Sequence, residues 1–164
     1  MRDHIGASRP AGNAMRSYLV VMDETQEARA ALRFAARRAA RTGGTVEILA
    51  LIPQQEFVQW GGVQAAMEEE ARLRAEAMVL QASGAIVEEA GIRPSITVKQ
   101  GDPVKAVSEL LVERENIAAL VLAAAPEGGP GPLVSHFSAK AGTLPCPVMI
   151  VPGRLSDETL DRLS

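Results

Sequence analysis

The stretch Ile117-Ala118-Ala119-Leu120-Val121-Leu122-Ala123-Ala124 is apolar throughout and shows no alternation. A strand with one face in water alternates apolar and polar residues, whereas a strand of a parallel sheet that is covered on both faces is continuously apolar. The run leads into residues 125–132, where Gly and Pro repeatedly interrupt regular structure. Ligands of open α/β sheets bind at the carboxyl ends of the strands. We therefore expect the loop after this strand to decide what the protein binds.

The rest of the chain supplies the partners of this strand. Short apolar runs predict strands over 17–22, 45–52 and 95–100, the last alternating like a strand near the sheet margin. Helical spacing predicts helices over about 25–41, 63–90, 103–116 and 133–143, with Thr25 and Asp102 as N-caps. Pro145-Cys146-Pro147 then leads into a last strand, Val148–Val151. Strands that alternate with helices predict one doubly wound (Rossmann-like) α/β domain, with a parallel sheet and helices on both faces.

Length and composition limit the class of protein. The 164 residues suit a single domain, and a formal net charge of −3 argues against a nucleic-acid partner. No apolar run has the length of a membrane span. The chain has one cysteine, Cys146, so no internal disulfide is possible. We interpret this cysteine as a buried apolar side chain. We therefore expect a cytoplasmic protein with a flexible leader over 1–16, the α/β domain over 17–152 and a C-terminal tail over 153–164.

Three motifs together resemble the universal stress protein family over about 17–152. They are Leu19-Val20-Val21-Met22-Asp23 before an Ala-rich helix, Gly101-Asp102-Pro103 before the next-to-last long helix, and the closing segment from Pro145 to Pro152. The resemblance implies a five-stranded parallel sheet in the order 3-2-1-4-5. It also implies a homodimer joined through the last strand, Val148–Val151.

Family members that bind ATP carry a glycine motif after strand four: Gly, two residues, Gly, about nine residues, then Gly-Ser or Gly-Thr. Glycine lets the backbone approach phosphates, and free N–H groups at the next helix receive them. Here Ala124 and Glu127 stand where the two glycines would be, and a register one residue earlier gives Ala123 and Pro126 instead. Pro126 has no N–H in either case, and the Gly-Ser site falls on Val134-Ser135. No Lys or Arg occurs between Ala123 and Ala139. We therefore expect no tightly bound cofactor.

Part of a nucleotide site is nevertheless retained. Asp23 matches the acidic residue that meets the nucleoside in binding members, although it could equally cap the following helix, and Leu51 lies near the position that lines the adenine. An adenosine half-site would accept ATP or AMP without a phosphate half. The candidate degenerate site is formed by Asp23, Leu51, Ala124, Gly128, Gly129, Gly131 and Ser135.

These patterns favour a stress-associated homodimer that acts through small-ligand or protein binding rather than turnover. The alternative is an ATP or nucleotide switch with slow hydrolysis, in which the Gly128–Gly131 loop cradles phosphates by an unusual path. A hydrolase built on Ser135 and His136 would need a carboxylate beside the histidine. We identify no catalytic residue, and the two histidines and one cysteine lack metal-ligand spacing.

Overall fold

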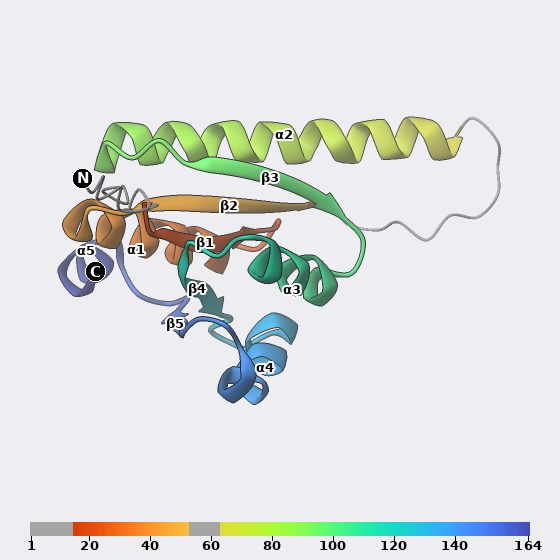
Figure 1. The fold of residues 1–164 in the computed structure, drawn as a ribbon. Helices are drawn as coiled ribbons and strands as arrows, with labels where there is room; N and C mark the ends of the chain where they lie inside the picture. The colour runs from red at the N-terminus through yellow and green to blue at the C-terminus, as the bar shows by residue number, and fades with distance from the viewer. Residues whose placement is uncertain (1–14, 53–62) are drawn as a thin grey trace, which may run out of the picture.

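The computed structural model describes residues 15–52 and 63–164. Five parallel strands form one sheet in the order β3-β2-β1-β4-β5, with helices on both faces (Figure 1), which confirms the predicted fold class and strand order. The elements in chain order are β1 (Ser17–Met22), α1 (Glu27–Thr42), β2 (Thr45–Ile52), α2 (Val63–Ala90), β3 (Ser95–Gln100), α3 (Pro103–Glu113), β4 (Ile117–Ala124), α4 (Pro132–Ala139), the 3-10 helix η1 (Ala141–Thr143), β5 (Val148–Pro152) and α5 (Asp157–Leu163).

The core consists of two apolar layers, one on each face of the sheet. Helices α1, α2 and α5 cover one layer, and α3 and α4 cover the other. Successive side chains of a strand point to opposite faces, so Leu120 of β4 enters the second layer and Val121 enters the first. Both are completely buried, and Leu19 and Val20 of β1 repeat the pattern. The unbroken apolar run Ile117–Ala124 is thus an interior strand, as predicted.

The two predicted N-caps differ in outcome. Asp102 caps α3 as expected, and its carboxylate accepts a hydrogen bond from the Val104 N–H at 2.9 Å. The prediction for Thr25 is wrong, because Gln26 is the N-cap of α1 and makes no side-chain cap bond. The Thr25 N–H and hydroxyl both donate to the Asp23 carboxylate instead. This local turn directs the Thr25 side chain towards Asp23, ahead of the helix, rather than towards the first N–H groups of α1.

The predicted helix over 133–143 is divided in two. Helix α4 ends at Ala139, and Lys140 takes φ −97° and ψ 1° before η1 begins. The Lys140 N–H lies within bonding distance of two carbonyls, those of His136 and Ser138. The bond to His136, four residues back, closes the last α-turn, and the Thr143 N–H then donates to the Lys140 carbonyl at 3.0 Å, three residues back, which is the 3-10 pattern.

Helix α2 is the longest element, and its first turns extend past the end of the sheet (Figure 1). Its Val63 and Met67 are accordingly 59% and 41% exposed. Farther along, Ala82 and Ile86 are buried against the first core layer. The first half of α2 buries Ala71 and Ala75 in a smaller cluster with Ile52 of β2, and the second half packs on the first core layer beside α1.

The predicted leader lies mostly outside the described residues, which begin at Met15. Its last two residues support the start of the sheet, because the Met15 carbonyl accepts from the Asn116 amide at 3.1 Å and the Arg16 carbonyl accepts from the Thr45 N–H at 2.9 Å. The predicted tail contains α5, whose Leu160 is 1% exposed in the first core layer. None of the helices in the described ranges has the length and apolar character needed to cross a membrane.

Candidate functional site

The carboxyl ends of β1 and β4 lie side by side because these strands pair in parallel. A cavity of about 160 Å³ lies there, between the start of α1 and the start of α4. Its lining comes from the ends of both strands, from the first residues of α1 and from the loop before α4. The lining residues are Val21, Asp23, Thr25, Glu27, Ala28, Leu122, Ala123, Pro130, Gly131, Pro132, Leu133 and Val134. This is the edge of the sheet at which the sequence predicted a binding site.

The structure brings only part of the predicted site to this cavity. Asp23 and Gly131 line it. Leu51 is buried in β2, within the second core layer. The remaining four predicted residues, which lie outside the lining, are Ala124, Gly128, Gly129 and Ser135. A ligand-binding role for the full set stays a prediction.

Asp23 is held in a defined orientation. Its Oδ1 accepts from the Thr25 N–H at 3.0 Å and from the Thr25 hydroxyl. The carboxylate is thereby fixed at the cavity rather than used as the N-cap of α1, which begins only at Glu27. A carboxylate accepts up to about four hydrogen bonds, so this turn leaves capacity for ligand hydroxyl or amino groups.

The loop between β4 and α4 offers few donors to a phosphate. Gly128, Gly129 and Gly131 adopt φ of +74°, +94° and +96°, conformations that favour glycine. The Ala125 N–H donates to the Pro130 carbonyl at 3.2 Å, so this amide is used within the loop. Proline follows as the first residue of α4 and has no N–H to offer. The start of α4 is therefore a poorer phosphate site than a glycine-rich helix N-terminus.

The charge around the cavity also opposes a polyphosphate. Asp23 and Glu27 place two carboxylates in the lining, and none of the lining residues is cationic. A basic residue does approach the outer loop, since Arg154 lies 3.7 Å from Glu127, but both side chains are largely exposed and pair with each other. Sequence reasoning missed Arg154, which reaches this loop because β5 lies beside β4.

Gly153 is a second residue that the sequence did not single out. Its N–H donates to the Ala124 carbonyl at 2.9 Å. A Cβ at this position would lie 2.6 Å from that carbonyl oxygen and 2.7 Å from the Glu27 Cβ. Glycine is therefore needed where the chain passes between the end of β4 and the start of α1.

The chemically reactive residues near the site are placed as structural groups. The ring of His136 packs edge-on against Phe137, with centroids 5.0 Å apart. Across the described ranges, no carboxylate is hydrogen-bonded or ion-paired to that histidine. Cys146 is 9% exposed, and its burial raises the pKa of its thiol, so less of it is the reactive thiolate at neutral pH. Within the same ranges, no group of His, Cys, Asp and Glu residues could hold a metal ion.

Fold and cavity together define a doubly wound α/β protein with a small, acidic site at the position where such sheets bind nucleotides. The model of the universal stress protein family matches residues 15–152. The chain belongs to this family, so it is a stress-response protein of the universal stress protein type.

Solved structures agree on the fold. A universal stress protein UspA from Lactobacillus plantarum shares 18% identity with a TM-score of 0.72, over 85% of this chain and 99% of that chain. A family protein from Burkholderia pseudomallei shares 16% identity with a TM-score of 0.65, over 86% of this chain and 98% of that chain. A universal stress protein from Archaeoglobus fulgidus in complex with dAMP shares 17% identity with a TM-score of 0.58, over 84% and 97%. A search of curated proteins returns no match.

Proposed function

We propose that this protein acts as a homodimer that binds a small ligand or a protein partner without binding ATP tightly. Its cavity at the β1 and β4 ends would take the sugar part of a nucleoside-like ligand, with Asp23 accepting hydrogen bonds from hydroxyl groups. The structural neighbour in complex with dAMP supports a ligand of this chemical type.

One observation carries the proposal: the cavity is lined by two carboxylates and by no cation. Phosphate groups would meet like charge there, whereas neutral hydroxyl groups would meet acceptors. The size agrees with a partial site, because about 160 Å³ is below the roughly 300 to 1,000 Å³ of pockets that enclose a whole small-molecule ligand.

The test is calorimetric titration with adenosine, AMP and ATP. We expect AMP and ATP to bind no more tightly than adenosine, and Asp23→Asn to weaken adenosine binding by about tenfold, since a hydrogen bond to a charged acceptor is lost. Thr143→Val, at a hydroxyl in η1 outside the cavity, is the matched control and should change nothing. Micromolar ATP binding would refute the proposal and favour the alternative function, a nucleotide-binding switch.

A second experiment tests whether Ala124 and Glu127, which stand at the glycine positions of the ATP motif, are what prevents phosphate binding. Introducing glycine at Ala124 and Glu127 should leave ATP binding weak, because Pro126, the proline that begins α4 and the carboxylates of the cavity remain. A large gain in ATP affinity would show instead that those two positions alone exclude the phosphates.

The dimer proposal rests on β5. It is an edge strand with one unpaired side, and Ile150 on it is 44% exposed. Ile150→Lys should convert dimers into monomers in light scattering. Val112→Lys, at an apolar side chain of α3 that is 80% exposed, is the control and should leave the mass unchanged. An unchanged mass for Ile150→Lys would rule out this interface.

We also place the protein in the cytoplasm, where its single cysteine would stay reduced. The nucleotide switch requires the Gly128–Gly131 loop to cradle phosphates, yet of its three glycines only Gly131 lines the cavity. No observation favours the switch over a ligand-binding dimer.

A further inference from the structure

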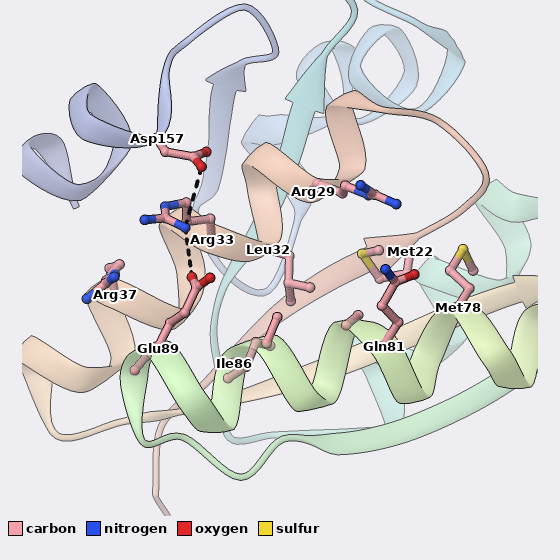
Figure 2. A pocket seen from close by; sticks show the side chains of 13 residues that line it. Met22, Arg29, Leu32, Arg33, Arg37, Met78, Gln81, Ile86, Glu89 and Asp157 are labelled. Atoms are coloured by element: carbon pink, nitrogen blue, oxygen red, sulfur yellow. Dashed lines mark hydrogen bonds and ion pairs between the residues drawn. The ribbon is translucent and has the colours of Figure 1, made fainter.

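A second cavity, of about 290 Å³, lies on the other side of α1, between α1 and α2 (Figure 2). It does not share a residue with the cavity at the β1 and β4 ends. Its residues come mainly from α1 and from the second half of α2, with one each from β1 and α5. They are Met22, Arg29, Leu32, Arg33, Arg37, Met78, Gln81, Ala82, Ala85, Ile86, Glu89, Ala90 and Asp157.

The inner part of this cavity is apolar. Leu32 and Ile86 face it from the two helices and are almost fully buried. Met22 and Met78 complete it, one at the end of β1 and the other on α2 (Figure 2). Methionine side chains are flexible and polarizable, so they adapt to apolar groups of different shape. This part suits a hydrocarbon chain or ring.

The polar part contains three arginines at intervals of four residues on α1, which places them along one side of that helix. Two of them are engaged. Arg33 lies 2.7 Å from Glu89 and makes two 2.8 Å hydrogen bonds to Asp161, and Arg37 lies 3.3 Å from the same aspartate. These ion pairs neutralise the end of the cavity nearest α5.

Arg29 is different. In residues 15–52 and 63–164 it makes no ion pair, and it lies at the other end of the cavity, across from Gln81 of α2 (Figure 2). A guanidinium and a primary amide on opposite sides of an opening are suitable donors for one carboxylate. A single available cation matches one negative charge, which favours a carboxylate over a doubly charged phosphate.

We propose that this cavity binds a small amphipathic carboxylic acid. The carboxylate accepts hydrogen bonds from Arg29 and Gln81, and the hydrocarbon part lies against the two methionines. A volume of about 290 Å³ corresponds to roughly ten water-sized groups, which sets the ligand at about ten non-hydrogen atoms. Pockets of this kind, mostly apolar with a few polar groups, are typical of small-molecule sites. The site is separate from the proposed nucleoside-like site and does not depend on it.

Octanoate is a suitable probe because it has about ten non-hydrogen atoms. The protein is labelled at its methionine methyl carbons and titrated by NMR, with signals assigned by single Met→Leu substitutions. We expect saturable shifts of the Met22 and Met78 signals. Met67, which is exposed on the projecting end of α2, and Met149 on β5 lie outside the cavity and serve as internal controls. Equal shifts of all four signals, or no saturable shift of the first two, would overturn the proposal.

Substitutions separate the two parts of the site. Arg29→Gln should weaken octanoate binding at least about tenfold while leaving the binding of neutral octanamide unchanged, because only the charged head group needs the arginine. Ala85→Phe, at an exposed lining position, should fill the cavity and abolish binding of both compounds. Arg72→Gln, at an arginine of α2 outside the cavity, is the matched control for charge. Equal affinity of the unsubstituted protein for octanoate and octanamide would contradict the assigned role of Arg29.

Discussion

Replacing Asp161 by asparagine tests how α5 is held on α1. Asp161 accepts two 2.8 Å hydrogen bonds from Arg33, and its Oδ1 lies 3.3 Å from Arg37. The two hydrogen-bonded side chains are 21% and 32% exposed, so the pair is only partly shielded from water. Asparagine keeps the size of the side chain but removes the charge and one acceptor oxygen.

The magnitude follows from this geometry. A hydrogen bond to a charged group contributes about 1.5 to 3 kcal/mol, and a fully exposed ion pair contributes about 0 to 1 kcal/mol. Because Asp161 is about one-third exposed, Asp161→Asn should lower the free energy of unfolding by about 1 to 2 kcal/mol at pH 7. The assay is urea unfolding followed by far-UV circular dichroism, with midpoint and slope compared for both proteins.

The effect should also depend on pH. Hydrogen bonding from Arg33 lowers the pKa of Asp161 below its ordinary value. The ion pair therefore stabilises the fold above about pH 4, and this stabilisation is lost as the pH falls through the folded-state pKa. The difference between the two proteins should stay constant from about pH 6 to 8 and begin to shrink as the pH falls below about 4.

Asp157→Asn is the matched control. Asp157 is 75% exposed and approaches Arg33 only to 3.7 Å, so its loss should cost less than about 0.5 kcal/mol. Equal effects of the two substitutions, or a difference that is the same at pH 3 and pH 7, would refute the assignment of the stabilisation to the Arg33–Asp161 pair.

Three further predictions concern the buried Leu160, the close approach at Gly153 and the thiol of Cys146. Leu160→Ala should lower the free energy of unfolding by about 2 to 4 kcal/mol, because this side chain is 1% exposed in the core; Leu163→Ala, at a 54% exposed position, should cost little in the same urea titration. Gly153→Ala should cost about 1 to 3 kcal/mol in urea unfolding, because its Cβ would meet the Ala124 carbonyl at 2.6 Å, and an unchanged midpoint would contradict this. The thiol of Cys146 should react with Ellman's reagent much more slowly in the folded protein than in urea, since it is buried with a raised pKa; equal rates would show that it is accessible.

The sheet could be predicted because its signals are local. The apolar run from Ile117 to Ala124 is long enough to identify an interior strand, and the Gly101-Asp102-Pro103 signal marks a helix start whose cap the structure confirms. Thr25 shows the limit of such signals. Threonine is a common N-cap, but here the Thr25 N–H and hydroxyl donate to Asp23 in a local turn, and the N-cap falls one residue later, at Gln26.

The candidate sites were harder to predict because they join residues that are distant in the sequence. Asp23 could be selected from its place at a strand end, and Gly131 from its loop. Nothing around Arg154 or Gly153 indicates that these residues lie against Glu127 and Ala124; this follows only from the pairing of β5 with β4. The second cavity combines Arg29 and Gln81 from two helices whose relative placement no local pattern encodes.

The strand order also has a consequence for how the chain is synthesised. Strand β1 lies at the centre of the sheet, between β2 and β4, yet it is the first strand to be made. Its β4 side stays open until residues 117–124 have left the ribosome, which at about 5 to 20 residues per second takes about 5 to 20 s. An open apolar strand edge is a template for pairing with other chains. Nascent chains are thus most prone to aggregate during this interval, and slow translation lengthens it.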